Sequence, residues 1–472
     1  MKPGNQATSQ AGNGRACRWL AACVLSLAVG HVQADDVDEL MATMMAVHRI
    51  PGLQLAVVKN GKLVKSASYG VANLQDSVAV HDDTVFTINS MTKGFAGVAV
   101  MQLVEQGKVD LAGPIGDYVS DLPAPWRPIT VQQLLSHTSG LPDIMGEAGY
   151  FIPIAGAEAA WQAVQLEPLE FPANTRFRYN QTNYLLIGKL IQNVAGQPFT
   201  DFIVENQLRK AAMPRTEAAG FAHFQGVVPG QARGYTYDIT GDLSTVYSEF
   251  PPSLRLAAGM SSSATELAQW VMALQAGDVF AQPGSLELLW TPARLADGNT
   301  AGFSRFINGY AVGWQVVDRA DHPAVALVGG NRAALLVYPE DDLAIVVLTN
   351  LMGASPETFI DAIAGHYIAG MESINGVAVA ADVLAEYAGE YAFANFSITV
   401  TVQGQGLSLL ASGEGQEAFP VFARSDNEFF AKVIDASFLF QRDDDGQVRG
   451  LLFRQGGNDM QATRVRPGRA GR

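Results

Sequence analysis

One serine in the sequence precedes a lysine by three residues, in the stretch Phe86-Thr87-Ile88-Asn89-Ser90-Met91-Thr92-Lys93-Gly94. Residues at i and i+3 of a helix share one face, so Ser90 and Lys93 are predicted to point into the same space. A serine needs a neighbouring base to become a useful nucleophile, and a lysine in a dry pocket can be that base because desolvation disfavours its charged form. The alternative is a serine that only caps a helix.

Patterns for other catalytic chemistries are missing from the sequence. The histidines beyond residue 34, at positions 48, 81, 137, 223, 322 and 366, include no i, i+4 pair and no His-Glu-x-x-His motif. No glycine-rich phosphate loop follows a predicted strand, and Gly-x-Ser-x-Gly is absent. His137 lies in a Ser/Thr/Gly turn and is predicted to be structural. We therefore expect neither a metal ion nor an organic cofactor.

The composition is that of a globular chain with more than one domain. Apolar residues make up 48% of the 472 residues and charged ones 16%. The net charge of −15 argues against nucleic acid and anionic membrane surfaces as partners. We expect a small-molecule or peptide-like substrate, and no pattern in the sequence indicates an oligomeric state.

The first 34 residues have the pattern of an export signal. Lys2, Arg15 and Arg18 precede an apolar run of about 12 residues, and Val32-Gln33-Ala34 offers small residues for cleavage before Asp35. The run is shorter than the roughly 20 residues of a membrane span, and no later segment is long enough. Both cysteines lie in this signal, so no disulfide is expected beyond it. We expect a periplasmic or secreted protein, and lipoprotein anchoring is disfavoured because the apolar run follows Cys23.

The elements that must position Ser90 and Lys93 come from both ends of a long domain. Two β-rich runs, 53–59 and 62–70, flank Asn60-Gly61, a strong hairpin signal because both residues tolerate positive φ. Further strands are predicted at 310–317, 324–328, 333–338 and 343–348, and helices at 36–48, 90–105, 130–135, 184–194 and 356–368. We therefore expect an α/β (α+β) domain over residues 35–370, with one antiparallel sheet from both chain ends, flanking terminal helices and a helical lobe.

A second domain is predicted after a linker at 371–386. Six short β runs follow, about eight to twelve residues apart, at 396–402, 406–411, 419–423, 428–433, 437–441 and 448–454. This spacing indicates a small all-β barrel over residues 387–466, although a sandwich is also compatible.

Several segments together resemble the serine β-lactamase-related hydrolases, the superfamily of class C β-lactamases, penicillin-binding proteins and esterases. The Ser90 stretch resembles their active-site segment, Leu134 to Pro142 their characteristic turn block, and Ala258 to Ala268 their glycine–serine segment. The order of these segments over about residues 36–370 is that of the family. The resemblance implies that Ser90 is the nucleophile and Lys93 its base. The C-terminal block resembles, more weakly, the small β-barrel appended to some of these hydrolases.

The family's second motif is a tyrosine with an amide two residues later. Tyr179 matches that tyrosine, and the resemblance implies that its oxygen shares the base role with Lys93, whose charge favours a phenolate. The alternative is an aromatic residue that merely flanks a helix. The usual amide is Asn, whereas this chain has Gln181, whose extra methylene displaces the amide by about 1.5 Å. Substrate binding by Gln181 is thus expected to differ from the family's.

The third motif normally places Lys or His, then Thr or Ser, then Gly on a strand beside the site. Alignment on the glycines puts Leu327-Val328-Gly329 there, so the polar pair is missing. Backbone N–H groups do not depend on side chains, and those of Ser90 and Gly330 are expected to form the oxyanion hole, with Gly329 contacting substrate. Loss of the cation removes a handle for a substrate carboxylate.

The sequence thus predicts an exported serine hydrolase that acts through an acyl-enzyme on an ester, amide or β-lactam-like bond, with small uncharged esters or amides favoured. Two alternatives remain open at this point. One is a β-lactamase or a D-alanyl carboxypeptidase or aminopeptidase. The other is a non-catalytic relative that binds a ligand or has a structural role, which the altered third motif permits.

Overall fold

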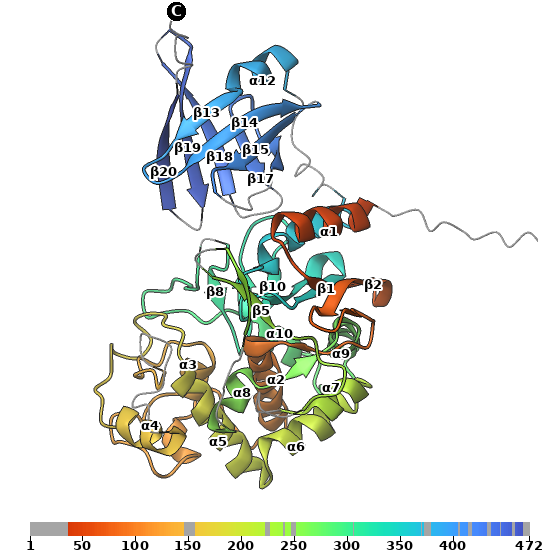
Figure 1. Cartoon of the computed structure of the whole chain (residues 1–472). Coiled ribbons are helices and arrows are strands. Elements are labelled where there is room, and N and C mark those ends of the chain that lie inside the picture. Colours follow the sequence, from red (N-terminus) through yellow and green to blue (C-terminus); the bar gives the residue numbers. More distant parts are fainter. Residues whose placement is uncertain are drawn as a thin grey trace, which may run out of the picture. The chain divides into compact units, whose positions relative to one another are not determined.

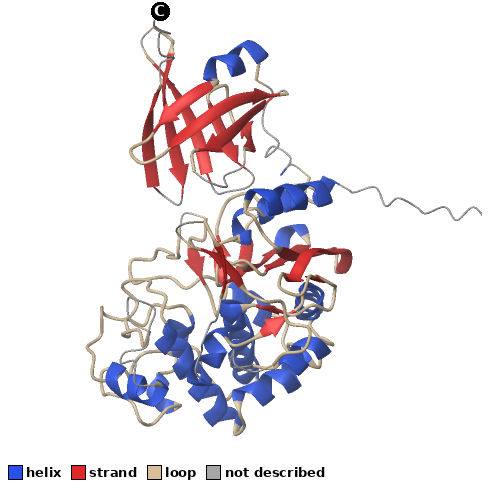
Figure 2. Cartoon of the chain, viewed as in Figure 1, coloured by secondary structure: helices blue, strands red, loops and turns tan. Residues whose placement is uncertain are grey.

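A computed structural model describes most of the chain beyond the predicted export signal. The described residues are 36–145, 156–221, 227–238, 241–246, 252–304, 306–369, 371, 379–404, 406–413, 418–431, 436–443, 445–455 and 458–465. The predicted signal (residues 1–34) and residues 372–378 of the predicted linker lie outside them. The rest comprises a mixed α/β domain and an all-β domain, as Figures 1 and 2 show.

The α/β domain is built on an eight-stranded antiparallel sheet that joins both ends of the domain. Its order is β3-β2-β1-β12-β11-β10-β9-β8. The bounds are β1 Gly52–Lys59, β2 Lys62–Asn73, β3 Val78–Ala79, β8 Gly309–Tyr310, β9 Gln315–Val317, β10 Ala324–Gly329, β11 Ala333–Tyr338 and β12 Leu343–Thr349. Asn60 and Gly61 have φ of 52° and 67°, and Lys59 pairs with Lys62, so the predicted hairpin is present. The predicted antiparallel sheet from both chain ends is confirmed.

Helices cover the two faces of this sheet, because its strands carry buried side chains on both. On one face, α1 (Asp36–Val47) and α11 (Ile360–Ala364) pack against side chains such as Leu55, Leu336 and Ile345. On the other face, α2 (Thr92–Glu105) and α9 (Ala264–Ala276) pack against Ala56, Leu335 and Val346.

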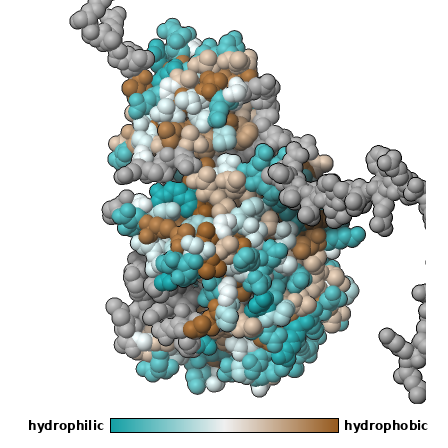
Figure 3. Space-filling model, turned by 45° about the vertical axis from the view of Figure 1, so that its right-hand side comes forward, coloured by the Kyte–Doolittle hydropathy of each residue, from teal (hydrophilic) through white to brown (hydrophobic). Residues whose placement is uncertain are grey.

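The molecular surface that Figure 3 shows has hydrophilic residues interspersed with small hydrophobic patches.

The helical lobe lies between β2 and the late strands in the sequence. Its helices are α3 Val131–Leu135, α4 Ala157–Val164, α5 Gln181–Ala195, α6 Phe199–Ile203, α7 Pro214–Ala219, α8 Arg255–Ala258 and α10 Ser285–Trp290. One short strand pair, β4 (Phe86–Thr87) with β7 (Ser261–Ser262), joins it to the segment before α2, and a second pair, β5 (Tyr235–Tyr237) with β6 (Leu243–Thr245), lies within this stretch of the sequence. Gly196 ends α5 in the left-handed conformation, as the sequence predicts.

Two elements that were predicted as continuous are interrupted in the structure, so these predictions are wrong. The strand expected over 310–317 is two short strands, β8 and β9, separated by a turn in which Gly313 has φ of +80°. That turn presses on α2, because a Cβ at Gly313 would lie 2.5 Å from the Lys93 carbonyl oxygen, and one at Gly97 would lie 2.1 Å from the Val312 oxygen. The helix expected over 356–368 is a 3-10 turn at Pro356–Thr358 followed by the short α11.

The C-terminal domain is a closed barrel of eight antiparallel strands. These are β13 Gly389–Ala392, β14 Ser397–Gln403, β15 Gly406–Ala411, β16 Phe419–Ala423, β17 Glu428–Ala431, β18 Ala436–Arg442, β19 Val448–Gln455 and β20 Asn458–Arg464. The barrel prediction is confirmed, but β13 and β20, whose pairing closes the barrel, are missing from the six predicted runs. A helix, α12 (Ala381–Tyr387), occupies part of the segment predicted as a linker.

Candidate active site

Ser90 is held at the entrance of a deeply buried helix. The chain reaches it from β4, turns through a 3-10 segment (Asn89–Met91) and continues as α2. The Thr92 hydroxyl closes this turn, donating to the Asn89 carbonyl at 2.6 Å and accepting from the Met260 N–H at 3.2 Å. The N-cap of α2 is Met91, so Ser90 is not the helix cap that the sequence left as an alternative.

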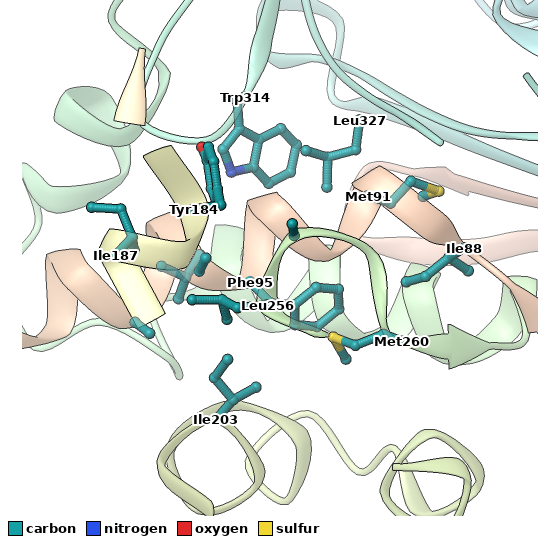
Figure 4. Close-up of a cluster of buried hydrophobic side chains, with 14 of the residues drawn as sticks. Ile88, Met91, Phe95, Tyr184, Ile187, Ile203, Leu256, Met260, Trp314 and Leu327 are labelled. Carbon is teal, nitrogen blue, oxygen red and sulfur yellow. The ribbon is translucent and has the colours of Figure 1, made fainter. Parts of the chain in front are cut away.

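The helix behind Ser90 is apolar on all sides, which fixes its place inside the domain. Twelve of its residues, Thr92 to Leu103, are buried. Figure 4 shows the packing around its first turn, with the labelled side chains Met91, Phe95, Leu256, Met260, Trp314 and Leu327. Lys93, in this first turn, is fully buried.

Lys93 is fully buried and its amine has three oxygen neighbours. Its Nζ lies 2.7 Å from the Ala257 carbonyl oxygen, 3.0 Å from Gln181 Oε1 and 3.4 Å from Ser90 Oγ. Burial lowers the pKa of Lys93 from 10.5 to about 7, and the charge of Asp143 opposes part of that shift. A neutral amine has two N–H bonds and one lone pair. Because the two carbonyl oxygens can only accept, they take the N–H bonds and leave the lone pair for the Ser90 hydroxyl.

Tyr179 stands directly before α5 and next to this pair. Asn180 caps the helix by accepting from the Asn183 N–H at 3.0 Å, and the Tyr179 ring centroid lies 4.7 Å from Lys93 Nζ. Burial raises the pKa of Tyr179 above its usual value, although hydrogen bonds with the side chains of Ser90 and Gln181 act in the opposite direction. The phenolate inferred from the sequence is therefore not favoured. The arrangement suits Lys93 as the base and Tyr179 as a hydroxyl that passes a proton.

The ring of His137 packs against the ring of Tyr179. Its ring centroid lies 4.2 Å from that of Tyr179, and its Nδ1 accepts from the Asn180 N–H at 3.2 Å. An acceptor at Nδ1 places the remaining proton of a neutral ring on Nε2, which has no hydrogen-bond partner in the described part of the chain. Burial holds the pKa of His137 well below its usual range, and the nearby Lys93 adds to this effect. A neutral, packed ring agrees with the structural role predicted for His137.

The side-chain oxygen of Gln181 accepts a hydrogen bond from the buried lysine. Its backbone N–H donates to Asp143 Oδ1 at 3.1 Å, while its Oε1 accepts from Lys93. Burial raises the pKa of Asp143, although this carboxylate also accepts from the Met145 N–H and lies near the charge of Arg178. Sequence reasoning missed Asp143. The available signal was a polar side chain following Pro142 directly at the end of the recognised turn block.

Gly329 and Gly330 end β10 beside the Ser90 turn. A Cβ on Gly329 would lie 2.0 Å from the Ile88 carbonyl oxygen, and one on Gly330 would lie 2.8 Å from Asn89 Oδ1. Gly330 and Asn331 have φ of +59° and +51°, and the Arg332 N–H donates to the Gly329 oxygen, which defines a tight type I′ turn. Gly329 thus packs against the backbone of Ile88 and Gly330 against the side chain of Asn89, so both glycines lie close to the turn that carries Ser90.

The third-motif positions have apolar side chains in the structure as in the sequence. Leu327 is buried against α2, since a Cβ on Gly94 would lie 2.5 Å from Leu327 Cδ1. Val328 and Gly330 line one pocket together with Ser90, Tyr179 and Phe303. The structure therefore brings all the predicted site residues to one place, and it adds Asp143 and Phe303 to them.

Other kinds of site find no support among the residues that the structure describes. No group of three or more His, Cys, Asp or Glu side chains in these ranges is arranged to hold a metal ion. Within the same ranges, no helix is long and apolar enough to cross a bilayer.

Comparison with known families gives two matches. The family described as Beta-lactamase matches residues 37–369, and a domain of unknown function, DUF3471, matches residues 375–465. The first match covers the α/β domain and the second the barrel.

Among curated relatives, the chain is similar to "Protein flp" of Staphylococcus aureus (strain N315), with 26% identity over 67% of this chain and 63% of that protein. The chain thus spans less than two thirds of that relative. Similarity to "Penicillin-binding protein 4*" of Bacillus subtilis (strain 168) is 22% over 90% of this chain and 98% of the relative.

Two solved structures show the same fold. An octameric penicillin-binding protein homologue from Pyrococcus abyssi has a TM-score of 0.61 and 20% identity, and the match covers 91% of this chain and 100% of that one. EstCE1, described as a hydrolase with promiscuous acyltransferase activity, has a TM-score of 0.58 and 19% identity over 68% of this chain and 93% of its own.

Proposed function

The chain belongs to the beta-lactamase family, a family of serine hydrolases, and from that premise we propose that it hydrolyses a small uncharged ester or amide through an acyl-enzyme on Ser90. The observation that carries the proposal is the buried amine of Lys93, held by the oxygens of Ala257 and Gln181 with Ser90 Oγ as its third neighbour. Burying an amine with these polar neighbours is unfavourable in free energy, and the arrangement has no evident structural purpose.

The first half of the reaction follows from this geometry. Ser90 Oγ attacks the substrate carbonyl carbon while its proton passes to the lone pair of Lys93. The carbonyl oxygen becomes an oxyanion and accepts from the N–H groups of Ser90 and Gly330. The proton then reaches the departing oxygen or nitrogen through the Tyr179 hydroxyl, the carbon–heteroatom bond breaks, and the acyl group remains on Ser90.

Hydrolysis of the acyl-enzyme uses the same groups in reverse. Lys93, again neutral, takes a proton from a water molecule, directly or through Tyr179, and the resulting hydroxide attacks the acyl carbon. Collapse of the second tetrahedral intermediate returns the proton to Ser90 Oγ and releases the acid. Because the pKa of Lys93 is about 7, its neutral form is available at ordinary pH.

The preference for an uncharged substrate rests on the apolar third motif. Leu327 fills the position of the usual cation, and it is buried against α2 rather than facing the pocket. A carboxylate held there, as in penicillins and D-alanyl peptides, would lose a charged partner, and burying an unpaired charge is strongly unfavourable.

We further propose that the protein is exported to the periplasm or secreted, on the basis of the N-terminal signal pattern. N-terminal sequencing of the protein recovered outside the cytoplasm should give a chain beginning at Asp35. Recovery of an uncleaved chain from the cytoplasm alone would contradict this proposal.

One set of measurements tests the proposed function. The protein and its Ser90→Ala variant are treated with a fluorophosphonate probe and a labelled penicillin, and then assayed with p-nitrophenyl esters and a chromogenic cephalosporin. Labelling and ester turnover that depend on Ser90 are expected. Fast cephalosporin turnover would instead support a β-lactamase, release of D-alanine from peptides would support a peptidase, and no labelling with no turnover would leave the non-catalytic relative.

A further inference from the structure

Phe303 is exposed in the pocket that contains the nucleophile. The side chain is 48% exposed, and it lines this pocket with Ser90, Tyr179 and Val328. Single exposed apolar residues are common on protein surfaces and need no explanation by themselves. Phe303 differs from such residues because it adjoins Tyr179, with 5.0 Å between the ring centroids.

The ring is held firmly, as a binding group must be. It packs edge-on against Phe177 at 5.3 Å and at a tilt against Tyr310 at 6.3 Å. The loop that carries it is closed by Ser304, whose N–H donates to the Ile307 carbonyl and whose Oγ accepts from the Ile307 N–H, both at 3.0 Å. A Cβ on Gly302 would lie 2.4 Å from that same carbonyl oxygen, so Gly302 packs closely against Ile307. A preorganised ring loses little entropy when a ligand covers it.

Apolar character also replaces polar character at the neighbouring positions. Val328, where the family pattern has Thr or Ser, is half-buried and lines the pocket, and Leu327 lies behind it. The pocket that contains Ser90 therefore has catalytic polar groups together with apolar side chains, among them Phe303 and Val328. This is the usual design of a small-molecule site, in which apolar walls bind and a few polar groups orient.

We propose that Phe303 and Val328 form a subsite for an apolar, preferably aromatic, group of the substrate, next to the bond that is cleaved. The inference rests on the proposed function and names the class of ester or amide that the site takes. Aromatic pairs in edge-to-face or offset contact gain about 0.5–1.5 kcal/mol beyond the area that they bury, which favours an aryl group over an alkyl group of similar size.

The test compares paired esters that differ only in this group. The wild-type protein is assayed with p-nitrophenyl acetate and phenylacetate, and with ethyl acetate and benzyl acetate, so that both sides of the scissile bond are sampled. We expect kcat/KM to favour the aryl member of at least one pair. Phe303→Ala should reduce that preference about 10-fold, the scale of a lost apolar contact in a binding pocket, and leave the acetate or ethyl member within about 2-fold. Phe303→Tyr should retain the preference.

Two controls separate this inference from the proposed function and from general damage. Leu288→Ala removes a side chain that is 54% exposed on α10 and lies outside the residues lining this pocket, so it should change neither ester. Phenylacetone and acetone, which cannot be hydrolysed, are titrated calorimetrically into Ser90→Ala and into Ser90→Ala/Phe303→Ala. Tighter binding of phenylacetone that disappears with Phe303 supports the subsite even if no ester is turned over. Equal aryl preference with and without Phe303, or equal binding of both ketones, would overturn it.

Discussion

The oxyanion hole proposed at Gly330 can be tested by adding a single methyl group. Gly330→Ala would place its Cβ 2.8 Å from both Cγ and Oδ1 of Asn89, at a φ of +59°. Real Cβ atoms essentially never approach another atom to within 3.0 Å, so either the Gly330 turn or the buried Asn89 side chain, directly before Ser90, has to shift by several tenths of an ångström. An oxyanion-hole donor acts only within about 2.7–3.1 Å of the oxyanion, so the shift should cost about 10²–10³ in kcat.

A matched variant isolates this effect from the strain of a left-handed alanine. Gly404, in the hairpin between β14 and β15, has the same φ of +59°, and its Cβ would meet nothing within 4 Å. A non-glycine residue in this conformation costs roughly 1–2 kcal/mol, so urea melts should show that loss in both variants, with a further loss in Gly330→Ala.

The assay is kcat for p-nitrophenyl acetate at saturating substrate, with the folded fraction checked by circular dichroism. Gly404→Ala should keep the wild-type kcat, while Gly330→Ala should lose it without a matching change in the fluorophosphonate-accessible fraction of folded protein. A Gly330→Ala protein that is folded and as active as Gly404→Ala would refute the assignment of Gly330 to the oxyanion hole.

Three further predictions concern the buried lysine. The pKa of Lys93 is about 7 and its neutral form is the base. The neutral fraction of Lys93 therefore grows from roughly 0.1 at pH 6 to 0.9 at pH 8, and kcat/KM of the wild-type protein should rise about 9-fold over this range. A flat pH profile would exclude Lys93 as the base. Asp143→Asn removes a negative charge that raises the pKa of Lys93, so the rise of kcat/KM with pH should occur at lower pH. A rise at an unchanged pH together with a lower kcat would indicate only structural damage. Because its folded-state pKa lies below the unfolded value of 10.5, Lys93 destabilises the fold fully below pH 7, and this cost fades as the pH rises to 10.5. Lys93→Met should therefore unfold at a higher urea concentration at pH 7, with a free energy of unfolding larger by up to about 5 kcal/mol, although the variant should be inactive. A variant that is equally or less stable would contradict the predicted destabilisation by Lys93.

The parts of the fold that were predictable depend on local signals. Asn60-Gly61 predicted the first hairpin because both residues tolerate positive φ, and Gly196 can end α5 because glycine tolerates it too. The spacing of Ser90 and Lys93 likewise needs only a helix. The prediction of one antiparallel sheet followed from the position of the strand-like runs at both ends of a helical middle.

The parts that were missed depend on contacts between distant residues. The break between β8 and β9 exists because Gly313 and Gly97 let two backbones touch, and nothing in 310–317 alone reveals that approach. Asp143 gained its place from the Gln181 N–H, and Phe303 from the rings of Phe177 and Tyr179, which lie far away in the sequence, as well as from nearby Tyr310. Burial also raises the pKa of Tyr179, and the sequence shows the charge of its neighbour Lys93 but not how deeply the phenol is buried.

The pairing of β1 with β12 has a consequence for the order in which the protein matures. Leu53 pairs with Thr349 and Lys59 with Leu343, so the central sheet cannot close until the last strand of the domain has been synthesised. Contacts of such long sequence separation form late and slowly. Gly329 and Gly330 also arrive almost 240 residues after Ser90. A growing chain therefore holds a serine and a lysine but not the proposed oxyanion hole, and hydrolytic activity should appear only when the α/β domain is complete.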